Sequence, residues 1–292
     1  MRNSISKAGI VTVFYNPPDS VLDVFIMFAK HGYFVVIYNN GISRKQLSKL
    51  RAYSMIKIVG GGKNVGLASG LNVALQNLWQ NQHVDGVMLL DQDSMPDVLL
   101  PEKLRHSYIQ LSANTKIACI GPRIVDVKKI ATDKPSSNLF FLEKAGIATS
   151  GTYMGKAAYF KIGSFMDELF VDCIDHEWCF RARSYGYKVF IDMNCSMLHD
   201  MGEIGVNFWG VYKPGYSSPV RHYYIVRNTL AMLRFLYVPL SWKIREIFKT
   251  IRRICFYVIV SSDRKSSIKN IGRGIIDGLK GHLGAMDALR KK

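Results

Sequence analysis

Two carboxylates one residue apart, Asp91 and Asp93, come directly after the apolar run Val87–Leu90. At the end of a buried strand such a pair would repel unless a cation lay beside it. Mg²⁺ and Mn²⁺ are held in this way, by one or two carboxylates together with substrate phosphates. A D-x-D spacing alone also occurs in solvated turns, so the apolar run is what favours a metal site.

A second acidic cluster lies in the apolar stretch Phe170–Trp178, where Asp172, Asp175 and Glu177 fall within six positions. A carboxylate held there could act as a general base toward a hydroxyl group. The pattern also predicts a helix over Asp175–Ser184, closed by Gly186, with Asp175 as its N-cap. Capping and catalysis are compatible, because a helix start fixes a carboxylate rigidly.

Three further motifs are less specific. Gly60–Gly66 matches neither a Walker A loop, which needs Ser or Thr at Asn64, nor a dinucleotide motif, which needs glycine at Val65. His199 is either a structural histidine or a third ligand of the Asp93 metal. Arginines at both ends of Arg221–Arg227 suit phosphate, although solvated surface arginines would look the same.

The elements that must position these residues alternate between strands and helices, which predicts βαβ units and a mainly parallel sheet. The strands are expected at Ile10–Phe14, Tyr33–Tyr38, Ile56–Val59, Val87–Leu90 and Lys188–Asp192. Polar clusters follow the first four of them. Because ligands bind beyond the carboxyl ends of strands in such sheets, these clusters are expected to share one site.

The bulk composition predicts a globular, reduced protein. Of 292 residues 48% are hydrophobic, and five cysteines lie at irregular spacings without a C-x-x-C pair. The first residues lack a signal-peptide pattern, and no stretch reaches the ~18 apolar residues of a membrane span. We therefore expect a cytoplasmic protein.

The charge is concentrated near the end of the chain. The formal net charge is +17, and residues 229–292 carry 14 Lys and Arg against four Asp and Glu, a net +10. This segment is helical, apolar and basic in pattern. It is equally compatible with a helix lying on an anionic membrane and with ordinary helices packed on the core.

Taken in order, VTVFYNP, VVIYNNG, KNVGLASGLNVAL, MLLDQDS, GPRIVD, LFVDCIDHEWCFRARSYGY, LHDMGE and RHYYIVRN resemble a known family. The chain is similar to inverting family 2 glycosyltransferases with the GT-A fold, most of all to bacterial rhamnosyltransferases of surface polysaccharide synthesis. The likeness runs from about Ile10 to Asn228. It implies an α/β GT-A catalytic domain over 1–228, with a nucleotide-binding part to about 125 and an acceptor-binding part from about 126, and a basic amphipathic helical tail over 229–292.

The resemblance also implies roles. Asp175 would be the catalytic base, although Ile174 replaces the acidic residue that usually precedes it. Asp93, Asp91 and His199 would bind Mg²⁺ or Mn²⁺. The nucleotide would contact Tyr15, Asn16, Asn39, Asn64 and Asp91. Asn39 stands where relatives have Asp, and its amide oxygen could accept from N3–H of uracil or thymine. Further donor, acceptor or phosphate contacts are expected from Lys63, Gly66, Gly151, Glu177, Trp178, Arg181, Arg221 and Arg227.

The implied reaction is a single displacement with inversion, from dTDP-L-rhamnose to a hydroxyl of a lipid-diphosphate-linked oligosaccharide in lipopolysaccharide O-antigen or capsule synthesis. The basic tail would hold the enzyme on the inner face of the plasma membrane. One alternative is another UDP- or dTDP-sugar as donor. A sugar nucleotidyltransferase would need a Gly-rich, Arg-containing loop in place of Tyr15–Asp19. A nucleic-acid-binding protein is suggested only by the pI of about 9.7, because no helix-turn-helix, zinc or RNP signature is present.

Overall fold

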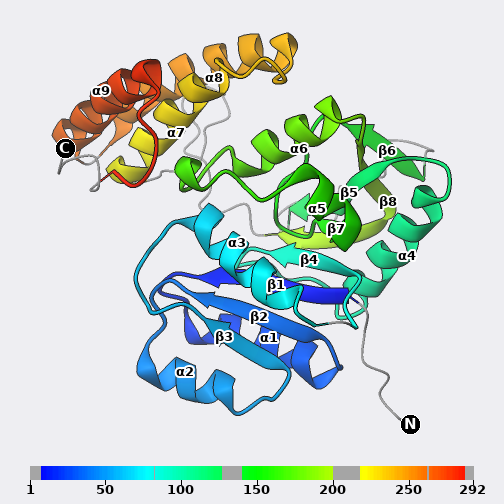
Figure 1. Cartoon of the computed structure of the whole chain (residues 1–292). Coiled ribbons are helices and arrows are strands. Elements are labelled where there is room, and N and C mark those ends of the chain that lie inside the picture. The colour runs from blue at the N-terminus through cyan, green and yellow to red at the C-terminus, as the bar shows by residue number, and fades with distance from the viewer. Residues whose placement is uncertain (1–7, 82, 127–139, 200–217, 262, 287–292) are drawn as a thin grey trace.

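A computed structural model describes residues 8–81, 83–126, 140–199, 218–261 and 263–286. Its strands form one sheet in the order β3-β2-β1-β4-β7-β5-β8-β6 (Figure 1). All strands run in one direction except β7 and β6, which are antiparallel to their neighbours. The strands are β1 Ala8–Phe14, β2 Phe34–Asn39, β3 Ile56–Val59, β4 Gly86–Leu90, β5 Ile117–Asp126, β6 Phe141–Lys144, β7 Tyr153–Gly155 and β8 Lys188–His199. The expected α/β architecture with a mainly parallel sheet is confirmed.

Helices cover both faces of the sheet, because side chains of each strand alternate between the faces. In β1, Val11 and Val13 face one apolar core and Ile10 and Phe14 face the other. The first core is closed by α3, α5 and α6, and the second by α1, α2 and α4. These helices are α1 Asp19–Lys30, α2 Arg44–Arg51, α3 Leu67–Leu78, α4 Leu100–Ser112, α5 Lys156–Ile162 and α6 Ile174–Ser184, with a 3₁₀ turn, η2, at Asp167–Leu169.

The start of α6 differs from the sequence prediction. The N-cap position is held by Cys173 in the left-handed conformation, with φ of 65°. Asp175 lies inside the first turn, where its carboxylate bonds to His176. The prediction that Asp175 is the N-cap was wrong, because the chain enters the helix through a left-handed loop that leaves no residue to cap it with a side chain.

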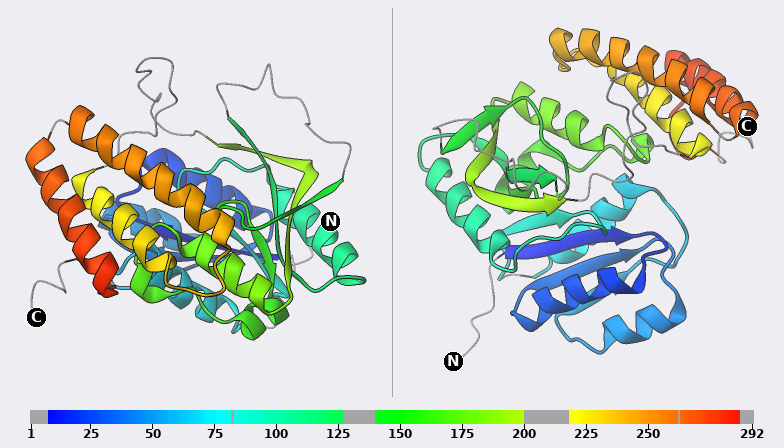
Figure 2. Two further views of the ribbon diagram at one scale, coloured as in Figure 1. Left: turned by 90° about the horizontal axis from the view of Figure 1, so that it is seen from above. Right: turned by 180° about the vertical axis from the view of Figure 1, so that it is seen from behind.

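Three helices follow the sheet domain and pack on one another: α7 Pro219–Met232, α8 Leu240–Val260 and α9 Arg264–Lys280 (Figures 1 and 2). α9 approaches α7 closely at two glycines. A Cβ on Gly274 would lie 2.7 Å from the carbonyl oxygen of Tyr223, and one on Gly278 would lie 2.8 Å from that of Arg227. The expected boundary after Asn228 falls inside α7. No helix within the described ranges is long and apolar enough to span a bilayer.

Candidate active site

Four loops meet beyond the carboxyl ends of β1 to β4. Consecutive parallel strands lie on opposite sides of β1, with β2 on one side and β4 on the other. Such a reversal opens a crevice for ligands. Two hydrogen bonds with backbone N–H donors join the loops. Tyr15 N donates to the side-chain oxygen Oε1 of Gln92 at 2.9 Å, and Asn16 N donates to the carbonyl oxygen of Gly41 at 3.2 Å. Tyr15 and Asn16 are exposed at this edge.

Asp91 and Asp93 lie in the loop after β4, Asp91 half-buried and Asp93 exposed. The loop is anchored to the segment before β7, because Ser94 and Ser150 share a hydroxyl hydrogen bond and Asp91 N lies 3.5 Å from Ser150 Oγ. Two carboxylates one residue apart, one half-buried and one exposed, fit a Mg²⁺ or Mn²⁺ ion that takes its other ligands from phosphate and water. Among the residues with described side chains no group of three His, Cys, Asp or Glu could hold a metal. His199 ends β8, but its side chain lies outside the described part.

The loop after β3 is held by two side-chain amides, that of Asn64 in the loop and that of Asn40 after β2. Asn64 Oδ1 accepts from Asn40 Nδ2 at 3.1 Å and from Gly66 N at 2.9 Å, while Asn40 Oδ1 accepts from Val65 N at 2.8 Å. The Asn64 oxygen therefore fixes the loop, whereas Lys63 beside it is exposed. The loop places Lys63 at the same edge as Asn16 and Asn39.

Gly66 is a point of close approach between two segments of backbone. It has φ of 88°, and a Cβ there would lie 2.6 Å from the carbonyl oxygen of Phe170. That oxygen accepts from Leu67 N at 2.6 Å and Ala68 N at 3.3 Å. It thus caps the start of α3 and ties the loop after β3 to the loop before α6. The phosphate contact expected of Gly66 stays a prediction.

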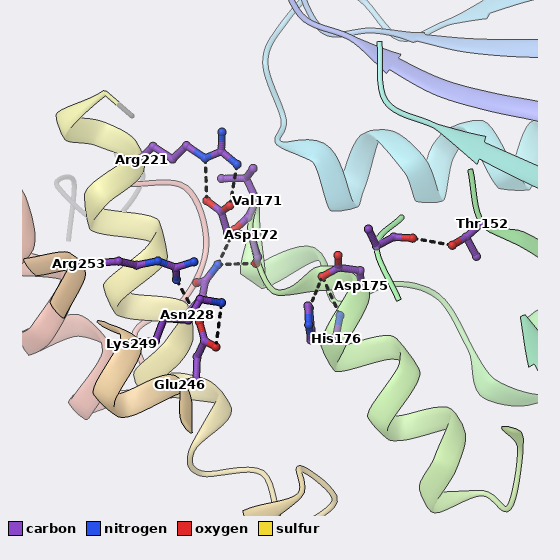
Figure 3. A network of polar contacts seen from close by, with 11 residues as sticks. Thr152, Val171, Asp172, Asp175, His176, Arg221, Asn228, Glu246, Lys249 and Arg253 are labelled. Carbon is purple, nitrogen blue, oxygen red and sulfur yellow. Dashed lines mark hydrogen bonds and ion pairs between the residues drawn. The ribbon is translucent and has the colours of Figure 1, made fainter. Parts of the chain in front are cut away.

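The loop before α6 has an unusual backbone. Phe170, Asp172 and Cys173 have φ of 65°, 60° and 65°, a left-handed conformation that costs about 1–3 kcal/mol for each such residue. Asn228 of α7 holds it, donating through Nδ2 to the carbonyl oxygens of Val171 at 2.5 Å and Asp172 at 2.9 Å (Figure 3). The same group donates to the carbonyl oxygen of Leu169 at 2.9 Å. The strained loop is therefore fixed by a distant helix.

Arg227 also fixes the loop before α6. It is fully buried, and its guanidinium donates to the carbonyl oxygens of Glu168 at 3.1 Å and Leu169 at 2.9 Å and to that of Gly284. Buried and bonded in this way, Arg227 has a structural role, and the phosphate contact expected of it stays a prediction. Arg227 joins the loop before α6 to the end of the chain.

Arg221 lies differently. Its side chain is 57% exposed and forms two bonds to the carboxylate of Asp172, at 3.0 and 3.3 Å (Figure 3). The negative charge of Asp172 raises the pKa of Arg221, and Asp91 raises it further. α7 therefore brings a cation near Asp91, where a diphosphate would lie beside the carboxylates.

Asp175 is the ionised group of the site. Its side chain is 23% exposed, and its Oδ1 accepts from His176 N at 2.8 Å and lies 2.9 Å from His176 Nδ1 (Figure 3). Burial alone would raise the pKa of Asp175, but the charge and hydrogen bonds of His176 bring it below its ordinary value. Within the described residues Oδ2 makes no hydrogen bond. This oxygen is available to a hydroxyl group.

A cavity of about 630 Å³ lies beside the segment that anchors the Asp91 loop, and its described lining residues do not include Asp91, Asp93, Asp175 or His176. Ser150 and Thr152 line it on the side of the Asp91 loop, and Gly146 lines it on the other. A Cβ on Gly146 would lie 3.7 Å from Cδ2 of His176, so this wall touches the Asp175–His176 pair. The wall of the cavity therefore contacts neighbours of both sites without containing their carboxylates.

Four other expected contacts have structural roles. Glu177 is fully buried and accepts from Arg181 Nε at 2.8 Å, from Arg181 Nη2 at 2.9 Å and from Tyr237 Oη at 2.8 Å. Trp178 is buried, with Nε1 donating to the carbonyl oxygen of Gly163 at 2.8 Å. Gly151 N donates to the carbonyl oxygen of Leu89 at 2.8 Å. These bonds give Glu177, Trp178, Arg181 and Gly151 structural partners, and the substrate contacts expected of them stay predictions.

Sequence reasoning missed Gln92, Ser150, His176 and Asn228. Gln92 and His176 sit inside motifs that were recognised for their neighbours, and Asn228 ends the run RHYYIVRN. Ser150 carried no signal, because its role depends on the loop after β4 lying against it.

Comparison with solved structures identifies the fold. The chain matches S. aureus TarS residues 1–349 with a TM-score of 0.56 at 13% identity, over 94% of this chain and 81% of that one. The same TarS fragment in complex with UDP-GlcNAc gives 0.58, over 94% and 82%. GalNAc-T7 with UDP, GalNAc and Mn²⁺ gives 0.52 at 13% identity, over 89% and 57%. The protein has the GT-A fold.

In sequence, no family model matches the chain. It is 28% identical to the dTDP-rhamnosyl transferase RfbF of Shigella flexneri, over 97% of this chain and 98% of that protein. The chain is a homologue of that enzyme, and with its fold this makes it a GT-A glycosyltransferase that uses a nucleotide sugar.

Proposed function

We propose that the protein is an inverting glycosyltransferase that moves L-rhamnose from dTDP-L-rhamnose to a hydroxyl of a lipid-diphosphate-linked oligosaccharide, in bacterial surface polysaccharide synthesis. The observation that carries the reaction class is the GT-A fold together with the two carboxylates after β4 and the ionised Asp175 held by His176. The homology with RfbF supports rhamnose and dTDP. The acceptor rests on the family resemblance of the sequence motifs.

Asp175 would act as the base. Its Oδ2 takes the proton of the acceptor hydroxyl while that oxygen attacks the anomeric carbon, and the bond from this carbon to the diphosphate oxygen breaks. One displacement inverts the anomeric centre, so no second nucleophile is needed. The bonds to His176 hold the carboxylate in place and keep it ionised.

Asp91 and Asp93 would hold a Mg²⁺ or Mn²⁺ ion, which when bound stabilises the charge of the leaving diphosphate. Arg221 adds a second positive charge near Asp91. Tyr15, Asn16, Lys63 and Asn39 lie around the edge where the nucleotide would bind.

A donor screen tests this proposal. Thermal shift and isothermal titration with dTDP-, UDP- and GDP-sugars, each with and without Mg²⁺ or Mn²⁺, should show the largest stabilisation for dTDP-L-rhamnose with metal. Product analysis by NMR should then show transfer with inversion. Preference for another UDP- or dTDP-sugar would replace rhamnose, and binding of no nucleotide sugar would contradict the proposal.

The protein would work on the cytoplasmic face of the plasma membrane, bound through α8. The stripe Leu240, Ile244, Phe248, Ile251 and Ile259 is exposed along one side of this helix. The opposite side packs through Trp242, Glu246 and Tyr257. The left view of Figure 2 shows α8 as a long helix on the surface of the molecule.

Basic residues flank the stripe. Arg245, Lys249 and Arg252 are exposed beside it, and each Lys or Arg near an anionic surface contributes about 1 kcal/mol. Apolar residues that enter the interface and cations that meet lipid phosphates form the usual pattern of a surface-bound helix. The acceptor is anchored in the same membrane, so this orientation would keep the enzyme beside its substrate.

A further inference from the structure

Asn39 ends β2 at the nucleotide edge, and its amide is oriented by the backbone that follows. Its Oδ1 accepts from Gly41 N at 3.1 Å and from Ile42 N at 2.7 Å. Backbone N–H groups can only donate, so the atom that faces them must be the amide oxygen. Both lone pairs of this oxygen are engaged, and the NH₂ group is turned the other way.

The NH₂ group has no partner in the described part of the chain, although the residue is only 7% exposed. It lies beside the glycine loop after β3, since a Cβ on Gly62 would be 3.6 Å from Asn39 Nδ2. A donor in a nearly buried position is more stable with an acceptor than without one. A ligand with an acceptor atom at this place would supply that partner.

We infer that Asn39 recognises the base of the donor nucleotide by donating from Nδ2 to a ring acceptor, not by accepting from an imide N–H. This inference rests on the proposed nucleotide-sugar function. It replaces the expectation from sequence that the amide oxygen accepts from N3–H. In thymine the available acceptors are O2 and O4, and N3–H between them would not be read by this side chain.

An aspartate at position 39 would reverse the contact. One carboxylate oxygen would take over the bonds from Gly41 N and Ile42 N, and the other would replace Nδ2. The group that faces the base would change from a donor to a charged acceptor. Thymine offers that acceptor its N3–H, whereas cytosine offers only a lone pair at N3.

The experiment compares the binding of dTDP, dCDP and N3-methyl-dTDP by isothermal titration in the presence of Mg²⁺, for the wild-type protein and Asn39→Asp. The matched control is Asn114→Asp, which changes an exposed amide after α4 to the same charged group. The affinities of the three nucleotides are compared as ratios within one variant. Contacts to sugar, phosphate and metal are common to the three nucleotides, so their contributions cancel in these ratios.

In the wild type, methylation of N3 should change the affinity for dTDP less than about tenfold, which corresponds to 1.4 kcal/mol. In Asn39→Asp the preference for dTDP over dCDP should rise by at least about tenfold. Asn114→Asp should leave both ratios unchanged.

The inference is overturned if N3 methylation weakens wild-type binding more than tenfold, or if Asn39→Asp leaves the dTDP to dCDP ratio unchanged. Should the variant not fold, the wild-type comparison of dTDP with its N3-methyl form decides alone. Failure of the wild type to bind any nucleoside diphosphate would overturn the proposed function as well. Binding with an unchanged ratio would overturn only the role of Asn39.

Discussion

Asp175 and His176 are adjacent in the chain and bonded side chain to side chain, with Oδ1 of the carboxylate 2.9 Å from Nδ1 of the imidazole. The pairing directs Oδ1 toward the helix and leaves Oδ2 toward solvent. Desolvation opposes the charge on His176, but Asp175 raises the pKa of His176 above its ordinary value. Each member of the pair therefore favours the charged form of the other.

Asp175→Asn should lower kcat by about 10²–10⁴, the usual contribution of a general base, while the Kd for the nucleotide sugar changes little. The amide keeps the shape of the carboxylate and removes its basicity. Stopped-assay turnover and titration calorimetry measure the two quantities. Asp23→Asn, at an exposed ion pair with Lys49, is the control and should keep full activity. Near-normal turnover of Asp175→Asn would show that another group is the base.

His176→Gln should move the acid limb of the pH profile of kcat to higher pH. The imidazole lowers the pKa of Asp175 against the effect of burial, so its removal lets burial raise that pKa, and the carboxylate protonates earlier as the pH falls. Turnover at saturating substrate over pH 4–9 measures the shift. His31→Gln, on the exposed end of α1, should leave the profile as it is. An unmoved acid limb in His176→Gln would contradict the role of the pair.

The same pair has a signature in stability. A lowered pKa of Asp175 contributes stability above the ordinary value of about 4, lost as the pH falls through the folded value. A raised pKa of His176 contributes stability below about 6.5, lost as the pH rises through the folded value.

Asp93→Ala should weaken the binding of nucleotide sugar in the presence of Mg²⁺ or Mn²⁺ by at least about tenfold and leave metal-free binding nearly unchanged. The exposed carboxylate is proposed as a metal ligand, so its loss acts only through the ion. Calorimetry with and without EDTA separates metal-free binding of the nucleotide sugar from binding that depends on the metal. Asp97→Ala, also exposed in the following turn, serves for comparison. Equal losses with and without metal would argue against metal binding.

Asn228→Leu should reduce the free energy of unfolding by about 3 kcal/mol, since three buried carbonyl oxygens lose their donor. It should also lower kcat more than it changes the Kd of the nucleotide sugar, because the loop that it releases leads into the helix of Asp175. Chemical denaturation and steady-state kinetics measure the two effects. Asn114→Leu removes an exposed amide and should do neither. A stable, fully active Asn228→Leu would mean that the loop holds itself.

Phe248→Ser combined with Ile251→Ser should reduce co-sedimentation with vesicles that contain anionic lipid by at least about tenfold, since both side chains are exposed on α8. Val73→Ser on α3 is the matched control, an exposed apolar residue away from α8. Substitutions are a sharper test than truncation after Asn228, which would remove α9 from the buried face of α7. Unchanged sedimentation would exclude the stripe as the membrane contact.

Much of the fold followed from local patterns. The short apolar runs, such as Ile10–Phe14, and the polar residues after each strand predicted the sheet and the edge where the site is proposed. The carboxylates of the Asp91 loop and Asp175 were recognisable because each lies in or next to an apolar run. The remainder depends on contacts between distant segments.

Arg227 illustrates that limit. A cation among aromatic residues in a helical pattern normally faces solvent or a ligand, yet this one is buried because the backbone of a loop 58 residues earlier presents carbonyl oxygens to it. Asn39 illustrates another limit: its residue type was noted, but which end of the amide faces the ligand depends on two backbone N–H groups. Neither the burial of Arg227 nor the orientation of the Asn39 amide can be predicted from the spacing of residues in the sequence.

The grip of α7 on the loop before α6 has a consequence for exchanging parts between related enzymes. Consider a hybrid that took the segment 166–176 from one homologue and the helix bearing Arg227 and Asn228 from another. Its strained loop would meet side chains that evolved to bind the loop of the other homologue. Recombination should succeed only when both pieces come from the same parent, so in lineages of this enzyme the two stretches are expected to change together.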